Sequence, residues 1–335
     1  MEKTVISAFN QFLNKKVNLD PEDTKNARAS RDWLIARIHE FPSKDSSFPL
    51  FYQDKDIYFG SFARKTKKRA LDDVDIMICL SAQEGSYFEH SDHIDIIVPD
   101  TALTLKNLCH DGTNKLNSRK VINKFISMLD KIPQYKNSKM KRNHEAAVLN
   151  LTSYPWSFDI VPCFFTKEDL VKRTYYLIPD GNGNWKKTDP RIDRERVTRI
   201  NQFHDGNVLN VIRIMKYWNK RSTMPSMPSY LIENMILNYY DSESGKASNF
   251  VDLEIPNILF YINTNIHTVV NDPKGIQGDI NTLNQEDRGK IQNRSYYDYN
   301  KAIKAREFEN KNDCKSSINQ WGEIFGDEYP EYDGD

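Results

Sequence analysis

Residues 60–80, GSFARKTKKRALDDVDIMICL, decide the fold of this chain. The apolar run up to Leu80 predicts a buried strand with an acidic start. Because side chains alternate along a strand, Asp73 and Asp75 point from the same face. Asp72 points the other way. A second apolar segment, Phe158-Asp159-Ile160-Val161-Pro162, predicts a neighbouring strand with a third carboxylate.

Three carboxylates on adjacent strands suit the transfer of a nucleotide. In that reaction two divalent cations, about 4 Å apart, position the reacting oxygens and neutralise developing charge. Mg²⁺ prefers carboxylate oxygens. We therefore predict that Asp73, Asp75 and Asp159 are catalytic and bind Mg²⁺, for which Mn²⁺ can substitute. Asp95, between Ile94 and Ile96, is the alternative third ligand.

The acidic start of the strand has a plainer explanation, since Asp-Asp-Val-Asp is also typical of a solvated strand end. However, acidic residues that lead directly into a buried strand are costly to desolvate unless a cation compensates them. The position of Gly60-Ser61, at the end of a short strand over residues 56–59 and twelve residues before Asp73, favours the catalytic interpretation. Glycine lets backbone amides approach a phosphate, and the serine hydroxyl adds a donor. The sequence has no Walker A spacing.

These motifs resemble the cGAS/DncV-like nucleotidyltransferases (CD-NTases) of bacterial antiphage defence, members of the DNA polymerase beta superfamily. The resemblance covers about residues 55–240 and includes the later stretches WKKTDP (185–190), IMKYW (214–218) and PSYLIE (228–233). It implies an α+β fold, with a polymerase-beta-like core of mixed sheet flanked by helices and a C-terminal helical lobe. It also implies that Lys216 and Ser229 hold the triphosphate, with Gly60 and Ser61 as further nucleotide-binding residues.

The residues around Lys216 and Ser229 leave other roles open. Residues 207–220 predict a helix with one apolar face, and Arg213, Lys216 and Lys220 fall on the other. Such a basic face is also typical of a helix surface in solvent. Ser229 is equally suited to cap the helix that follows it.

Composition sets limits on the function. The 47 basic and 47 acidic residues cancel, which gives no support for charge-driven binding of long nucleic acid. The stretch 115–142 is basic, with nine Lys/Arg and one acid, and it is either a solvated face or a nucleic-acid site. The four scattered cysteines predict a reduced, cytoplasmic protein, and neither a Cys pair nor a Cys/His cluster has zinc spacing. No apolar run is long enough to span a membrane.

The order of predicted elements gives three parts. Residues 1–190 form the nucleotidyltransferase core with N-terminal helices near 4–17 and 21–41, residues 191–322 form the helical lobe, and residues 323–335 form an acidic tail. Helices are expected over 115–132, 207–219, 230–240 and 285–312. Strands are expected over 56–59, 74–80, 146–151 and 158–164, and residues 94–98 are either another strand or part of an insertion.

The leading hypothesis is a template-independent synthase that makes a cyclic di- or trinucleotide messenger from nucleoside triphosphates, ATP and/or GTP, in antiphage (CBASS-type) signalling. A downstream effector then acts through the product, and neither a membrane nor nucleic acid is required. We expect a cytoplasmic monomer. The alternatives are an RNA-tailing or tRNA-end nucleotidyltransferase and a catalytically inactive nucleotide-binding module.

Overall fold

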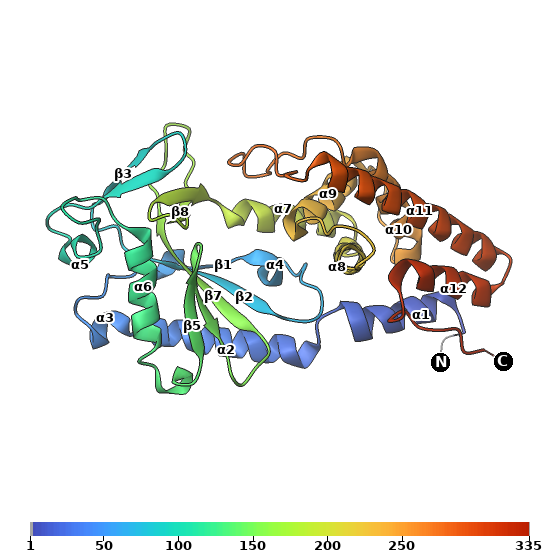
Figure 1. The fold of residues 1–335 in the computed structure, drawn as a ribbon, viewed down its shortest axis with the longest axis horizontal. Coiled ribbons are helices and arrows are strands. Elements are labelled where there is room, and N and C mark those ends of the chain that lie inside the picture. The colour runs from blue at the N-terminus through green and yellow to red at the C-terminus, as the bar shows by residue number, and fades with distance from the viewer. Residues whose placement is uncertain (1–2, 335) are drawn as a thin grey trace. The chain divides into compact units, whose positions relative to one another are not determined.

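The computed structural model describes residues 3–334 and divides the chain into two compact units. Unit 1 contains Met1–Pro21, Arg64–Ala70 and Ile192–Asp335, and it is helical. Unit 2 contains Glu22–Ala63 and Leu71–Arg191, and it carries the sheet. Figure 1 labels the elements of both units. The chain is thus an α+β protein with a mixed sheet and a C-terminal helical lobe, as the sequence predicts.

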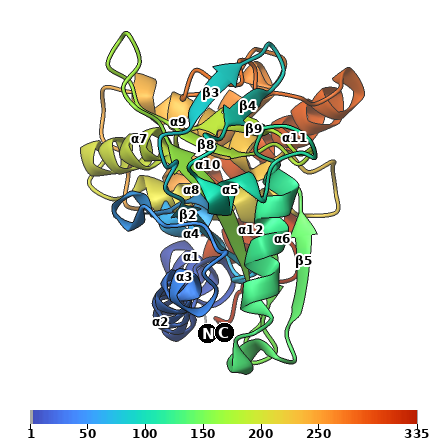
Figure 2. The ribbon, with the colours of Figure 1, turned by 90° about the vertical axis from the view of Figure 1, so that its left-hand side faces the viewer.

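The nine strands found within residues 3–334 form one sheet in unit 2, with the order β1-β2-β7-β8-β9-β4-β3, and β6 pairs with both β5 and β7. The pair β2–β7 is parallel, and the other pairs are antiparallel. Figure 1 shows β2 beside β7, and Figure 2 shows β3 beside β4. The strand bounds are β1 Ile57–Tyr58, β2 Asp73–Cys79, β3 Ser86–Glu89, β4 Ile94–Ile97, β5 Lys139–Asn143, β6 Ala146–Asn150, β7 Ser157–Phe165, β8 Tyr176–Pro179 and β9 Trp185–Thr188.

Alternation along β2 and β7 gives the sheet two different faces. Val74, Ile76 and Phe158 are buried on one face. The opposite face begins with acidic residues and continues into an apolar cluster that includes Met77 and Val161. The strands expected over 74–80 and 158–164 are therefore present. β2 begins and ends one residue earlier than expected, and β7 is one residue longer at each end. The four strands β3, β5, β8 and β9 were not expected, because they are short and three of them are largely polar or exposed.

The helices of unit 2 are α2 Pro21–His39, α3 Phe41–Lys44, α4 Gly60–Ala63, α5 Leu103–Lys106 and α6 Ser118–Leu129, with 3₁₀ turns at Gln53–Lys55 and Pro133–Tyr135. Helix α6 packs against β5, β6 and β7. It begins three residues later than expected, because the side chain of Asn117 accepts hydrogen bonds from the amides of Arg119 and Lys120 and so caps the helix there.

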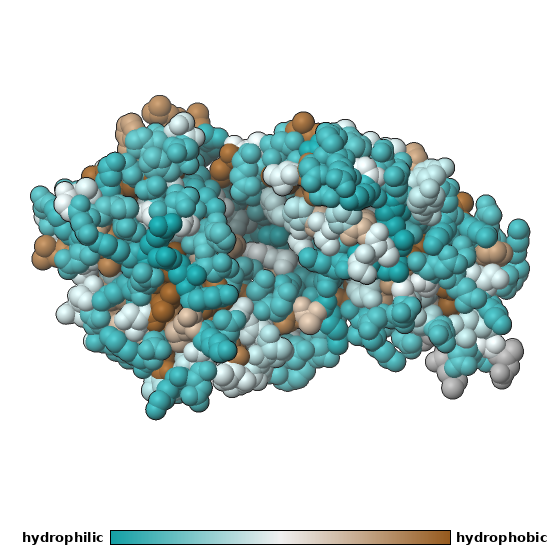
Figure 3. All heavy atoms as spheres, viewed as in Figure 1, coloured by the Kyte–Doolittle hydropathy of each residue, from teal (hydrophilic) through white to brown (hydrophobic). Residues whose placement is uncertain are grey.

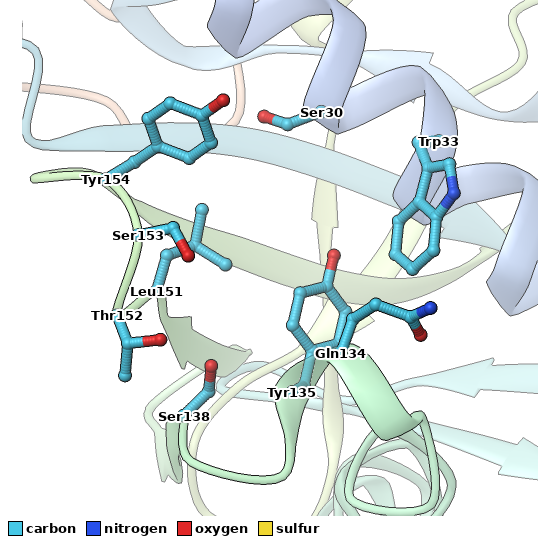
Figure 4. Close-up of a pocket in the computed structure, with 9 residues that line it drawn as sticks. All are labelled: Ser30, Trp33, Gln134, Tyr135, Ser138, Leu151, Thr152, Ser153 and Tyr154. Atoms are coloured by element: carbon cyan, nitrogen blue, oxygen red, sulfur yellow. The ribbon is translucent and has the colours of Figure 1, made fainter.

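Helix α2 has a buried side and a partly exposed side. Leu34 and Ile38 are buried, whereas Trp33 is 37% exposed. Its ring packs edge-on against Tyr135, with centroids 5.7 Å apart. Both rings line a hollow of about 210 Å³ that Tyr154 also borders (Figure 4). Trp33 is therefore a wall of this hollow rather than a core residue.

Unit 1 is built from α1 Val5–Phe12, a π-helical turn Leu13–Val17, α7 Pro190–Phe203, α8 Val208–Asn219, α9 Ser229–Ser242, α10 Val251–Asn265, α11 Gln285–Asn310 and α12 Cys314–Phe325. One apolar core runs through these helices, and Trp218, Ile236, Ile258 and Trp321 are among its fully buried members. The helices expected over 207–219, 230–240 and 285–312 correspond to α8, α9 and α11.

The N-terminal helix joins unit 1 and not the sheet unit to which residues 1–190 were assigned. Phe9 and Phe12 bring the apolar face of α1 into the core of unit 1. The ring centroid of Phe9 lies 5.0 Å from that of Trp321 in α12. The expected acidic tail also begins inside α12, and Tyr329 is buried. Apolar side chains therefore attach both segments to the helical unit. Asp335 lies outside the described residues.

Some apolar side chains of unit 2 remain at the surface. Figure 3 shows a group of them over β3 and the neighbouring loop. Phe88 in β3 and Leu170 and Val171 in the loop after β7 are exposed.

Among residues 3–334, no helix combines the length and the apolar character that crossing a bilayer requires.

Candidate active site

The parallel pair β2–β7 brings the three predicted aspartates together. Asp75 is the direct partner of Asp159, and Asp73 is the partner of Ser157. Directly paired residues of neighbouring strands share a face, and so do residues i and i+2 of one strand. All three carboxylates therefore lie on one face of the sheet. Each aspartate is partly exposed, whereas the residues between them are buried.

Gly60 packs directly against this acidic face. It has φ = +69°, and a Cβ atom placed on it would overlap Asp75 Oδ2 and lie 2.5 Å from Asp75 Cγ. Two features of the structure therefore require glycine at position 60. Its backbone is left-handed, and the carboxylate of Asp75 occupies the space that a side chain would need. The sequence predicted that Gly60-Ser61 ends a strand. In the structure β1 ends at Tyr58, and Gly60 and Ser61 form the first turn of α4.

The structure separates the two candidates for the third carboxylate. Asp159 lies directly beside Asp75 in β7. Asp95 lies in β4, and β8 and β9 stand between β4 and β7 in the sheet order. Asp95 Oδ2 lies 2.7 Å from Lys115 Nζ in that separate part of the sheet. Asp72 is exposed, as expected for its opposite orientation. The geometry therefore joins Asp159, and not Asp95, to Asp73 and Asp75.

The donor set of this face fits a hard divalent cation. Carboxylate oxygens are the protein ligands that Mg²⁺ and Mn²⁺ prefer. The three aspartates leave coordination positions free for phosphate oxygens and water, since Mg²⁺ is usually held by only one or two carboxylates plus substrate phosphates. Asp73, Asp75 and Asp159 are therefore the residues of unit 2 that would hold such an ion.

Lys216 does not lie on an exposed basic face, contrary to the helical pattern. It is only 4% exposed, and its ammonium forms an ion pair with Glu233 of α9. Lys216 Nζ also lies 3.3 Å from the backbone oxygen of Thr66. Burial lowers the pKa of Lys216, and the carboxylate of Glu233 opposes that shift. Lys216 is thus held inside unit 1 by a buried acidic partner.

Glu233 is the centre of this network. Its Oε1 accepts a hydrogen bond of 2.6 Å from Arg64 Nε, and its Oε2 accepts one of 2.9 Å from Thr66 Oγ1. Although burial opposes the shift, the charges of Arg64 and Lys216 lower the pKa of Glu233 to about 2. This role of Glu233 was not predicted from the sequence. The signal was a carboxylate directly after Leu231 and Ile232 on the apolar part of α9, which predicts a buried ion pair.

Ser229 is the first residue of α9 and is exposed. The N-cap position belongs to Pro228, and no side-chain hydrogen bond caps the helix. Ser229 therefore does not cap α9, contrary to the second role that the sequence allowed. An exposed hydroxyl in the first turn of a 14-residue helix is well suited to meet an anion, because the free amides and the helix dipole favour negative charge there.

The basic stretch 115–142 is partly used within unit 2. Several of its lysines form ion pairs with Asp45, Asp95 or Asp111, namely Lys115, Lys120, Lys124 and Lys131. Such pairs reduce the positive charge available to a nucleic acid.

A larger hollow of about 820 Å³ lies elsewhere on unit 2, between residues such as Tyr52, Tyr87 and Phe165. Its described lining does not include the three aspartates.

A parallel strand pair with three carboxylates on one face and a Gly-Ser turn against them defines a nucleotidyltransferase core. Comparison with known proteins agrees. A protein of Bacillus cereus (strain VD146) named probable cyclic nucleotide synthase is 44% identical over 335 residues, which is 99% of this chain and 100% of the relative. No family model matches the chain.

Solved structures show the same fold. Escherichia coli MS115-1 CdnC covers 97% of this chain, with 98% of its own chain matched and 16% identity. The TM-score is 0.68 for its complex with HORMA-deltaN and 0.67 for its structure with ATP. Vibrio cholerae DncV cyclic AMP-GMP synthase, a prokaryotic cGAS homolog, has a TM-score of 0.66 at 12% identity, with 99% and 98% of the two chains covered.

The chain belongs to the family of its relative from Bacillus cereus, which is named a probable cyclic nucleotide synthase, and it has the fold of the cGAS/DncV-like nucleotidyltransferases. It is therefore a nucleotidyltransferase with the two-part fold of that family. The resemblance predicted from residues 60–80 and from the segment around Asp159 is confirmed.

Proposed function

We propose that this protein makes a cyclic di- or trinucleotide from nucleoside triphosphates, without a template. The observation that carries the proposal is the acidic face of β2 and β7, where Asp73, Asp75 and Asp159 lie together and Gly60 packs against Asp75. The relative at 44% identity, named as a cyclic nucleotide synthase, supports the same activity.

The proposed cation is Mg²⁺, with Mn²⁺ as a substitute, bound by the three aspartates. When bound, it neutralises charge on the triphosphate and helps to orient the attacking hydroxyl. The side chains of unit 2 have three tasks. Asp73, Asp75 and Asp159 supply the hard ligands, Gly60 leaves the space that Asp75 occupies, and the α4 turn at Ser61 offers donors to a phosphate.

Lys216 and Ser229 are proposed to contact the triphosphate. For Ser229 the support is an exposed hydroxyl at the start of α9. For Lys216 the support is the resemblance alone, because its ammonium is held by Glu233. A phosphate contact by Lys216 therefore requires that the ammonium exchange part of its interaction with Glu233 for the phosphate oxygens.

We also propose that ATP and/or GTP are the substrates and that the enzyme works as a monomer in the cytoplasm. CdnC, a structural neighbour, was solved with ATP. The product would act on a separate effector in antiphage signalling. Such a role needs neither a membrane nor a nucleic-acid activator.

The test is turnover of the four ribonucleoside triphosphates by the purified chain with Mg²⁺. We expect a short product that resists phosphatase, because ring closure leaves no terminal phosphate. The Asp73→Asn/Asp75→Asn variant keeps the size of both side chains and should yield no product. A ladder of extended RNA, without a phosphatase-resistant species, would assign the protein to the RNA-tailing enzymes instead.

A further inference from the structure

A second group of metal-ligating side chains lies in unit 2, away from the acidic face. His90 and His93 are in the turn between β3 and β4, and Asp95 follows in β4. One ligand atom from each of the three lies within 4.8 Å of the others. In the sheet order, β4 is separated from β7 by β8 and β9. We propose that His90, His93 and Asp95 form a Zn²⁺ site that is independent of the nucleotidyltransfer centre.

The distances suit a tetrahedral ion. A zinc ion about 2.1 Å from each of three tetrahedral donors separates those donors by roughly 3.4 Å. His90 Nε2 lies 2.9 Å from Asp95 Oδ2, and His93 Nε2 lies 3.7 Å from Asp95 Oδ1. The two imidazole rings are stacked, with centroids 4.4 Å apart. Small side-chain rotations are therefore enough to bring all three donors into coordination range.

The hairpin turn orients these donors. The amide of His90 donates to the backbone oxygen of His93 at 2.9 Å, which closes the turn between β3 and β4. His93 Nδ1 lies 2.8 Å from Asp92 Oδ1, so Asp92 fixes the ring with Nε2 toward Asp95. A carboxylate on the second nitrogen of a ligating histidine is the usual support in zinc sites.

The donor types select zinc over the proposed cation of the acidic face. Imidazole nitrogen suits Zn²⁺ and other late transition metals, whereas Mg²⁺ prefers oxygen ligands. Three protein ligands also leave one tetrahedral position for water. Asp95 is only 5% exposed, whereas the two histidines reach solvent, so an ion can enter from the open side of the turn.

One side chain competes with the ion. Lys115 Nζ lies 2.7 Å from Asp95 Oδ2, and the Lys115 side chain is 50% exposed. The lysine therefore neutralises Asp95 in the metal-free protein and can swing into solvent when zinc binds. The neighbouring Glu89 is engaged by Lys187 of β9. The site was not predicted from the sequence, because His90-x-x-His93-x-Asp95 contains no cysteine and does not have the spacing of a Cys/His zinc motif.

The test measures zinc bound by full-length protein without a histidine tag, after chelator treatment and dialysis against Zn²⁺. Asp73→Asn/Asp75→Asn serves as the background, so that zinc at the acidic face does not contribute. We expect about one zinc per chain in this background and at least tenfold weaker binding after His90→Gln/His93→Gln is added. His144→Gln, at an exposed histidine in the β5–β6 turn, is the matched control and should bind like the background.

Two further measurements keep the result independent of folding. Co²⁺ added to the background protein should give the visible absorption bands of a tetrahedral N/O site, and these should be lost in Asp95→Asn. Zn²⁺ should raise the Tm of the background protein but not that of His90→Gln/His93→Gln, whose circular dichroism should match that of the background. No zinc in the background, or equal zinc in the background and the double-histidine variant, would overturn the proposal.

Discussion

Replacing Gly60 by alanine tests whether the acidic face is the catalytic centre without removing any carboxylate. The new Cβ would lie 2.5 Å from Asp75 Cγ. Carbon atoms pack at about 3.5 Å, so Asp75 must retreat by about 1 Å. A displacement of that size at a reacting centre lowers the rate on the order of a hundredfold. The positive φ adds about 1–2 kcal/mol of backbone strain to the folded state.

Gly112 supplies the matched control for that strain. It has φ = +71°, close to the +69° of Gly60, and a Cβ there meets no atom within 4 Å. Gly112→Ala should therefore lose stability through its backbone alone and keep its turnover. Both variants should be compared by Tm and by turnover of radiolabelled ATP with Mg²⁺. Equal turnover in the two variants would refute the link between Gly60, Asp75 and catalysis.

The remaining predictions concern charged groups. Asp73→Ala/Asp75→Ala should abolish turnover and leave Tm unchanged or raised, because two like charges are removed; loss of the folded state would make both residues structural. Lys216→Ala should weaken binding of a non-hydrolysable ATP analogue by about 1–3 kcal/mol, the range of a charge-assisted contact, and unchanged affinity would restrict Lys216 to its ion pair with Glu233. The pKa of Glu233 in the folded protein is about 2, below its ordinary 4.5, so its charge stabilises the fold above pH 4.5 and that contribution is lost as the pH falls toward 2. At pH 6 the free energy of unfolding of the wild type should therefore exceed that of Glu233→Gln by about 3 kcal/mol. This difference in free energy should become smaller below pH 4.5. A difference that stays the same between pH 6 and pH 3 would contradict a stabilising ion pair at Glu233.

The acidic centre could be predicted because it depends on local rules. Alternation places Asp73 and Asp75 on one face whatever surrounds the strand. An apolar segment around Asp159 predicts a neighbouring strand, but only the parallel register shows that Asp159 lies directly beside Asp75. The contact between Gly60 and Asp75 was not predictable in detail, since it depends on the φ of +69° that Gly60 adopts after β1.

Features that depend on distant partners were not predicted. Lys216 has the helical position of a surface residue, yet it is buried because Glu233 and Thr66 come from separate segments of unit 1. The first helix was assigned to the sheet unit because it precedes the sheet in the sequence. Its phenylalanines instead complete a core with Trp321, more than three hundred residues away.

Short polar strands were also missed, since β3 has no buried residue to give an alternating pattern. Because β3 was not predicted, the β3–β4 hairpin was not predicted either. This hairpin is what brings His90 and His93 close to Asp95.

Mass spectrometry of the product tests whether this chain is a cyclic nucleotide synthase. The purified chain is incubated with the four ribonucleoside triphosphates and Mg²⁺, treated with phosphatase, and compared with Asp73→Asn/Asp75→Asn. A cyclic nucleotide synthase should give a product that survives phosphatase and is absent from the variant. Its mass should be that of two or three joined nucleoside monophosphates, one water less than the linear oligonucleotide that carries a 5′-monophosphate. A product of linear mass, or a cyclic product that persists in the variant, would contradict it.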